Sequence, residues 1–309
     1  MLFEEILIKW LNEKRNYVKE STYAYYNFEV KNYIIPMLGK IQAKEITEEH
    51  IQTAVLDWQR TGMENGNPLK KSTVQNLVML IKQVLKYGAR KGFMGESLMD
   101  IHFMPQTDNK KKKKVFSLGE QNQIIKAVLS KLDYRSFGIL LCINSGLRIG
   151  EVCALKWEDI DRKEGILYVT KTLQRIYMKN TIPHTQIIIS EPKTLSSIRE
   201  IPLSSKILEI ISELPDLNPE GYILSNSEHY IEPRTFRKYY DSFLKRESII
   251  QLNFHCLRHT FATRCIENGA DYKSISEILG HTTINTTLNM YVHPQMEEKR
   301  KCVEMIHWD

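Results

Sequence analysis

Five consecutive lysines, Lys110–Lys114, constrain the fold of this chain more than any other feature of the sequence. Neighbouring like charges repel one another, so the stretch Gln106–Lys114 is predicted to be an extended linker and not part of a packed core. It separates residues 1–105 from residues 115–309, and a length of 309 residues is typical of two domains. The linker is either a solvated tether or a segment that follows a nucleic-acid backbone.

The net charge is also distributed unevenly between the two parts of the chain. The formal net charge is +6 at pH 7; residues 1–114 carry the whole excess, and residues 115–309 balance to zero. An excess on one part of the chain favours a polyanionic partner without identifying it.

Composition indicates the compartment. Hydrophobic residues make up 42% and charged residues 26%, which excludes a disordered chain. No stretch has the roughly 20 uncharged apolar residues of a membrane helix, and the N-terminus is acidic where a signal peptide is basic. Five cysteines without paired spacing fit a reducing environment. We therefore expect a cytoplasmic protein with no membrane partner.

Residues 1–105 are predicted to be all helical. A first helix carries an apolar face, a second runs from Ser21 to Pro36, and Thr47 caps a third. The apolar face of the first helix consists of Phe3, Ile6, Leu7, Trp10 and Leu11. A fourth helix buries apolar residues between Val74 and Leu85.

The fourth helix also carries a basic stripe, because Lys82, Lys86 and Arg90 follow one another at intervals of four. The stripe is either a solvated face or a surface that contacts phosphates.

Residues 115–309 mix helices with a few strands, so the fold class is mainly α with a small antiparallel sheet. A capping box at Ser117 begins the first helix, and an apolar helix ends at Gly146. Strand patterns cover 166–169, 186–189 and 199–203, and the last two are expected to form a hairpin around Pro192–Thr194. Four further helices are predicted at 236–244, 255–268, 272–279 and 283–291.

Several kinds of chemistry are not indicated. The sequence lacks a phosphate-cradling glycine-rich loop, a Gly-x-Ser-x-Gly elbow and a carboxylate cluster suited to magnesium. What remains is a set of basic residues at the ends of elements and one tyrosine.

Two short motifs carry the strongest basic candidates. Arg148 follows a glycine turn and opens a helix, a favourable place to bind phosphate, and Glu151 one turn later could orient it. Alternatively the two form a surface ion pair. His255 and Arg258 are three residues apart on one helix and suit a phosphate whose charge grows during reaction.

The second motif also permits other interpretations. His255, Cys256, His259 and Cys265 are potential zinc ligands, although no CxxC pairing supports such a site. His259 could equally be a packed core histidine.

Three further residues gain meaning only from their order. Lys193 lies in a predicted turn, His281 follows Gly280, and Tyr291 lies on a short helix. Taken singly they would be a solvent lysine, a turn histidine and a core aromatic. The complete series in chain order is Arg148, Lys193, His255, Arg258, His281 and Tyr291.

This series resembles the tyrosine recombinase family, the phage-integrase-like site-specific recombinases. The resembling stretches are SGLRIGEVCALKW, PKTLSSIREIPL, HCLRHTFAT and LGHTTINTTLNMYVH, and the likeness covers nearly the whole chain. It implies that residues 1–105 form a helical, SAM-like core-binding domain, that residues 106–114 form the linker, and that residues 115–309 form an integrase-type catalytic domain with a tail from about residue 295.

The resemblance also implies a reaction. Tyr291 would attack the scissile phosphate of DNA and leave a 3′-phosphotyrosine and a free 5′-hydroxyl, with no metal, ATP or other cofactor. His255 would assist proton transfer, and Lys193 would protonate the leaving oxygen. Arg148 and Arg258 would hold the phosphate oxygens, His281 would position the phosphate, and Glu151 would orient Arg148.

Partners follow from the same resemblance. The basic residues assigned to DNA are Lys82, Lys86, Arg90, Lys110, Lys111, Lys112, Lys113 and Lys114. Family members act as tetramers on specific double-stranded sites, so we expect a homo-oligomer on DNA, helped by an accessory DNA-bending or directionality factor. The tail Met296–Asp309 would dock on a neighbouring copy or pack on its own domain.

Two departures and several alternatives remain. Cys256 stands where an acidic residue is common in the family, and the chain starts almost directly at the first core-binding helix, so the arm-binding domain of many integrases is expected to be missing.

Integration and excision of a phage or conjugative element is the leading function. The alternatives are Xer-like resolution of replicon dimers, a non-catalytic DNA-binding protein and a nicking-closing topoisomerase.

Overall fold

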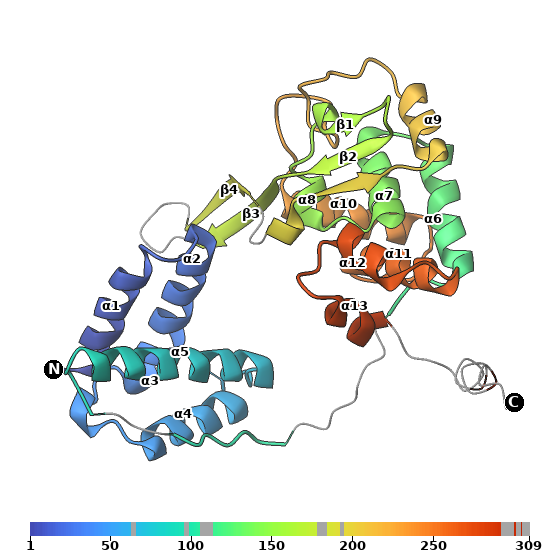
Figure 1. The fold of residues 1–309 in the computed structure, drawn as a ribbon. Helices are drawn as coiled ribbons and strands as arrows, with labels where there is room; N and C mark the ends of the chain where they lie inside the picture. The colour runs from blue at the N-terminus through green and yellow to red at the C-terminus, as the bar shows by residue number, and fades with distance from the viewer. Residues whose placement is uncertain are drawn as a thin grey trace, which may run out of the picture. The chain divides into compact units, whose positions relative to one another are not determined.

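The computed structural model groups the chain into two compact units. The N-terminal unit comprises Met1–Lys110 with Ile176–Gln186, and the C-terminal unit comprises Lys111–Arg175 with Ile187–Asp309 (Figure 1). The residues that the structure describes are 1–62, 66–95, 99–105, 114–177, 184–191, 195–291, 300 and 304; the side chains of 195 and 289–291 are outside this description.

The described part of residues 1–105 is helical, as predicted. Its elements are α1 (Phe3–Lys14), α2 (Glu20–Glu29), a wide π turn (Val30–Ile34), α3 (Ile35–Leu38), a 3-10 turn (Ala43–Glu45), α4 (Glu48–Arg60) and α5 (Lys71–Arg90). The predicted apolar face of α1 is confirmed, since all five of its residues are buried in one core with α4 and α5. Thr47 caps α4 and accepts a hydrogen bond from the backbone N–H of His50.

The expectation that the second helix stops at Pro36 is wrong. Helical backbone continues through the π turn into α3, and Pro36 lies in the first turn of α3. Because proline has no backbone N–H, the continuing helix lacks one backbone hydrogen bond at this junction.

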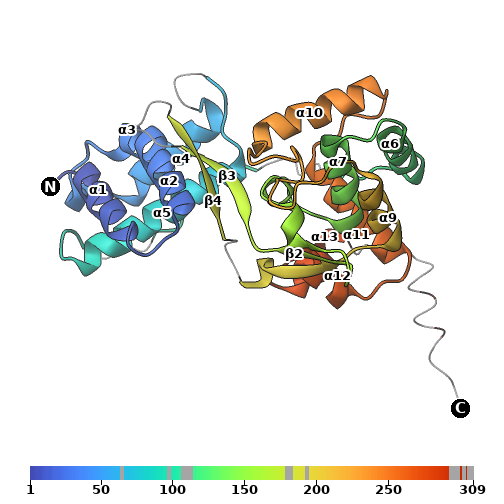
Figure 2. The ribbon, with the colours of Figure 1, turned by 90° about the horizontal axis from the view of Figure 1, so that it is seen from above.

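The C-terminal unit contains helices and short strands. Its helices are α6 (Leu118–Ser130), α7 (Tyr134–Ser145), α8 (Ile149–Val152), α9 (Ser205–Glu213), α10 (Pro233–Arg246), α11 (His255–Glu267), α12 (Tyr272–Leu279) and α13 (Ile284–Tyr291). Two 3-10 turns cover Trp157–Asp159 and Leu195–Ser197. Figure 2 shows α7 and α11 close together, in agreement with their extensive contact.

The strands are β1 (Ile160–Asp161), β2 (Ile166–Val169), β3 (Thr172–Tyr177), β4 (Thr185–Ser190) and β5 (Arg199–Pro202). An antiparallel sheet has the order β1-β2-β5, with Leu167 opposite Ile201, and β3 and β4 form a separate two-stranded sheet. In Figure 1 α12 lies below β5, which it contacts. The predicted fold class, mainly α with small antiparallel sheets, is confirmed.

The predicted hairpin of the last two strands is wrong. β4 pairs with β3 and β5 pairs with β2, so the two strands belong to different sheets. Strand pairing depends on partners elsewhere in the chain, and a turn signal between two strands does not determine it.

Two left-handed glycines end helices where the sequence predicted caps. Gly146 ends α7 with φ 67° and Gly280 ends α12 with φ 64°. A Cβ at Gly146 would lie 2.7 Å from Leu279 Cδ2, so a side chain is excluded by packing as well as by backbone. Within the described residues, no helix is long and apolar enough to cross a membrane.

Candidate active site

A cleft of about 1260 Å³ opens in the C-terminal unit. Its walls come from α8, β3, the first turns of α10, the start of α11 and the segment after α12. Four of the predicted site residues line it, namely Arg148, Glu151, His255 and His281. These four residues come from three separate stretches of sequence, which the fold brings to one concave surface.

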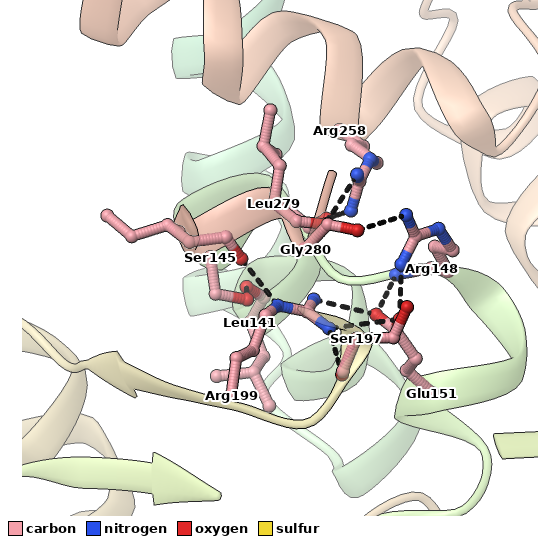
Figure 3. A network of polar contacts seen from close by, with 11 residues as sticks. Leu141, Ser145, Arg148, Glu151, Ser197, Arg199, Arg258, Leu279 and Gly280 are labelled. Atoms are coloured by element: carbon pink, nitrogen blue, oxygen red, sulfur yellow. Dashed lines mark hydrogen bonds and ion pairs between the residues drawn. The ribbon is translucent and has the colours of Figure 1, made fainter. Parts of the chain in front are cut away.

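Arg148 reaches the cleft from the start of α8. Its side chain is 36% exposed, and the guanidinium donates to Glu151 Oε1 at 2.7 Å and to the Gly280 carbonyl at 3.2 Å (Figure 3). The backbone N–H of Arg148 donates to Glu151 Oε2 at 2.8 Å. These contacts hold the arginine in one orientation while part of it stays open to solvent.

Glu151 is shared between two arginines. Arg199 donates to Oε1 at 3.1 Å and to Oε2 at 2.8 Å, and the Glu151 side chain is only 3% exposed. Burial pushes the pKa of the Glu151 carboxyl upward, but the hydrogen bonds and charge of Arg199, with the charge of Arg148, outweigh burial and lower the pKa to about 2. Glu151 is therefore ionised throughout the neutral range.

Arg258 lies buried behind the cleft. It is 1% exposed, and its terminal nitrogens donate to the carbonyls of Gly146 at 2.8 Å and Leu279 at 2.6 Å. Figure 3 shows Arg148 and Arg258 approaching the Leu279–Gly280 segment from α8 and α11. The carbonyls at two helix ends thus fix a second positive charge.

The two histidines of α11 differ in exposure. His255 is exposed and lines the cleft, whereas His259, one turn later, is buried. Their rings contact each other edge to face with centroids 4.5 Å apart. The interpretation of His259 as a packed histidine is consistent with its burial.

His281 follows the left-handed Gly280 directly. Its Nδ1 lies 2.8 Å from Oγ1 of Thr287, a fully buried residue on α13. Partial burial, followed by the charges of Arg258, Arg148 and Arg199, lowers the pKa of His281 to about 4. The ring is therefore neutral at pH 7.

Two of the six series residues are described incompletely or not at all. Tyr291 is the last residue of α13, and only its backbone belongs to the described part. Lys193 lies outside the described residues, as do Lys110, Lys111, Lys112 and Lys113 of the predicted linker and nearly all of the tail.

The described residues offer no arrangement of side chains that could bind zinc. No three His, Cys, Asp or Glu side chains among them come together to hold a metal ion. Cys256 is buried against the core, so it does not face His255 in the cleft.

The basic stripe on α5 belongs to the N-terminal unit. Lys82, Lys86 and Arg90 are all exposed, and the two lysines line a shallow groove of about 460 Å³ together with Met79 and Gln83. Arg90 pairs with Glu13 at 3.2 Å. Lys114 is exposed as well.

Our sequence analysis missed Arg199. The signal was its alternation with Ile201 in a short strand, which places a charged side chain on the buried face.

The sequence analysis also missed three cleft arginines. Arg175 pairs with Glu232, and Arg234 and Arg237 are exposed on the first turns of α10. For Arg234 and Arg237 the available signal was their spacing of three, which places both on one face of a helix, although the helix predicted at 236–244 begins after Arg234.

Two family models match this sequence. The model of the phage integrase family matches residues 114–298, more than half of the chain. The model of the N-terminal SAM-like domain of phage integrases matches residues 2–59.

Known proteins align over almost the whole chain. A tyrosine recombinase XerC-like protein of Caldanaerobacter subterraneus subsp. tengcongensis is 26% identical over 97% of this chain and 77% of its own length. The ICEBs1 integrase of Bacillus subtilis is 24% identical over 96% of this chain and 78% of its own length.

Solved structures share the fold. The Tn1549 transposon integrase in complex with a circular intermediate DNA has a TM-score of 0.77 at 20% identity, and the alignment covers 99% of both chains. A λ integrase dimer bound to a COC′ core site has a TM-score of 0.66 at 16% identity, covering 94% of this chain and 96% of that one. At these identities the likeness establishes the architecture.

Proposed function

This chain belongs to the phage integrase family and is a site-specific tyrosine recombinase; we propose that it cuts and rejoins duplex DNA through a covalent bond between Tyr291 and a 3′-phosphate. The observation that carries the assignment of residues is the cleft lined by Arg148, His255 and His281, with Arg258 behind it. Positive charges fixed around one concave surface suit a phosphodiester whose charge grows in the transition state.

The first step transfers the phosphate from DNA to the protein. The Tyr291 phenol loses its proton to His255 as its oxygen bonds to phosphorus, because a phenol with pKa near 10 is a weak nucleophile when protonated. The bond from phosphorus to the 5′-oxygen breaks, and Lys193 donates a proton to that oxygen. The products are a 3′-phosphotyrosine and a 5′-hydroxyl, and attack by a second 5′-hydroxyl reverses the step on the partner strand.

The fixed charges stabilise the phosphate during transfer. Arg148 contacts the non-bridging oxygens from its exposed side, and Arg258 supplies charge from the interior. His281 is neutral at pH 7. We assign it the tautomer in which Nδ1 accepts from Thr287, 2.8 Å away, and Nε2 donates a hydrogen bond to the phosphate. Glu151 orients Arg148.

The remaining basic residues hold the DNA. In this proposal residues 1–105 form the core-binding domain, Lys82, Lys86 and Arg90 contact phosphates, and Lys110–Lys114 follow the backbone as a linker. Residues 115–309 form the catalytic domain, and the protein acts as a tetramer on two sites in the cytoplasm, associated with the nucleoid and with an accessory DNA-bending or directionality factor.

The test uses nicked suicide duplexes that carry candidate attachment sites, incubated in EDTA and resolved on denaturing gels. We expect a covalent protein–DNA band for the wild type and none for Tyr291→Phe. Tight, sequence-specific binding by a wild type that gives no band would support the non-catalytic alternative. A covalent band that persists in Tyr291→Phe would remove Tyr291 as nucleophile.

The biological setting is integration and excision of a mobile element, with dimer resolution as the second candidate. Relatives of both kinds align with this chain, an integrase of ICEBs1 and an XerC-like recombinase. Selection of genomic fragments that the protein cleaves separates the two. Sites at the ends of the element that encodes the chain support integration; a single site shared by replicon copies supports dimer resolution.

A further inference from the structure

Arg199 is a buried arginine that does not line the cleft. It begins β5, its side chain is 5% exposed, and it is not among the described residues on the cleft wall. Its guanidinium donates to both oxygens of Glu151, to the Ile278 carbonyl at 2.5 Å and to the Ser197 carbonyl at 3.2 Å. The desolvation of such a charge is costly unless partners on several sides compensate it.

The charges around Glu151 show what Arg199 adds. Arg148 and Arg199 both donate to the one carboxylate, so two positive charges share a single negative charge (Figure 3). Without Arg199, the whole charge of Glu151 would be compensated by Arg148. The arginine that faces the cleft would then present little net charge to a phosphate.

We infer that Arg199 is a positioning residue, which neutralises and orients Glu151 so that Arg148 keeps its positive charge for the scissile phosphate. The inference rests on the proposed function of Arg148. Arg199 touches no reacting atom in this account and acts through Glu151 alone.

A second role for Arg199 must be separated from this one. Its bonds to Ile278 and Ser197 join the end of α12 to the segment before β5, so it could simply brace the site. The two roles predict different results when the charge of Glu151 is also removed. If Arg199 neutralises Glu151, removing that charge should compensate for the loss of Arg199. If Arg199 is a brace, it should not, because neither carbonyl contact is restored.

The experiment compares Arg199→Gln, Glu151→Gln and the double variant with the wild type. Single-turnover cleavage of suicide duplexes at saturating protein is measured, with unfolding midpoints as a check of folding. We expect Arg199→Gln to slow cleavage about 10- to 100-fold, the scale found for residues that hydrogen-bond to the ligands of a metal site and orient them. The double variant should cleave faster than Arg199→Gln alone, because its Arg148 is no longer neutralised.

Arg199→Lys adds a further check. It keeps the charge and loses the fork, so we expect cleavage between that of the wild type and that of Arg199→Gln. A double variant that cleaves no faster than Arg199→Gln would overturn the inference in favour of a brace. An Arg199→Gln variant that cleaves like the wild type would overturn both roles.

DNA affinity tests the inference independently of cleavage. Arg199→Gln should bind site DNA more weakly than the double variant, since a neutralised Arg148 contacts phosphate less well; equal affinities would refute the inference. If the wild type itself formed no covalent product, the proposed function would fail while this ranking of affinities would still decide the role of Arg199.

Discussion

A carboxylate shared by two cations occurs in the described part of each unit, and the two clusters differ chiefly in burial. In the C-terminal unit Glu151 pairs with Arg148 at 2.7 Å and Arg199 at 2.8 Å. In the N-terminal unit Glu13 pairs with Arg90 at 3.2 Å and Lys91 at 3.1 Å. The Glu151 side chain is 3% exposed, whereas that of Glu13 is 33% exposed.

The difference shows how burial gives the same charges different uses. Around Glu13, water and salt screen the attraction, so the pairs contribute little to folding and the cations remain available to a partner. Around Glu151 the loss of water makes every missing partner costly, which fixes the geometry of Arg148. A buried cluster therefore suits transition-state contacts, and an exposed one suits adjustable contacts to a DNA backbone.

The largest expected effect is on stability. Glu151→Ala leaves Arg199 buried without its carboxylate, so the free energy of unfolding should fall by about 3–5 kcal/mol. Glu13→Ala removes an exposed pair and should cost about 0–1 kcal/mol. Urea unfolding of both variants measures the contrast; equal losses would show that burial does not separate the two clusters.

The second effect concerns the rate of cleavage. Arg258→Gln removes a fixed charge behind the cleft, and we expect single-turnover cleavage to fall about 10²- to 10³-fold, as for loss of a transition-state donor. The control is Arg246→Gln, since Arg246 is exposed at the end of α10 and pairs only locally with Glu247. A loss of similar size in the control would assign the effect to overall charge.

The third effect concerns the affinity for DNA that the exposed lysines of α5 provide. Lys82→Ala with Lys86→Ala should lower the slope of log affinity against log salt by about 1.8, because each phosphate contact contributes about 0.9. The affinity for DNA should fall by a larger factor than the rate of cleavage measured at saturating protein. Lys40→Ala with Lys44→Ala removes the same charge from two exposed lysines of the same unit that are not part of α5. An identical drop in slope for this variant would argue against a specific role for the stripe.

The smallest expected effect is on the pH dependence of stability. The pKa of His281 in the folded protein, about 4, lies below its ordinary value of 6.5, so the folded state binds the proton less well than the unfolded chain does. The stability from neutral His281 is complete above pH 6.5 and is lost as the pH falls toward 4. Partial exposure makes this loss smaller than the full shift implies.

Unfolding midpoints between pH 7 and pH 4 test the titration of His281. His281→Gln should flatten the decline. A decline as steep in His281→Gln as in the wild type would show that other groups cause it.

Much of the helical framework was predictable because its signals are local. The apolar face of α1, the cap at Thr47, the box at Ser117 and the glycine end of α7 each depend on residues a turn apart. The Arg148–Glu151 contact is of the same kind, since Arg148 is the N-cap of the short helix α8 that contains Glu151.

What sequence reasoning missed depends on contacts between distant residues. β5 pairs with β2 and not with β4, and Arg199 meets Glu151 across 48 positions in the chain. In both pairs, the sequence around one partner gives no signal for the other partner. A charged residue alternating with Ile201 was the only local trace of the buried pair.

The sequence by itself determined the position of most helices, because backbone capping and side-chain periodicity are local. It also contains the series of residues whose order resembles the tyrosine recombinases. Only the tertiary structure decided which of the charges are buried, which carbonyls hold Arg258, and that Glu151 serves two arginines. Desolvation and shared partners arise when separate segments pack together, and they determine whether a charged residue becomes a fixed part of a site or an adjustable surface contact.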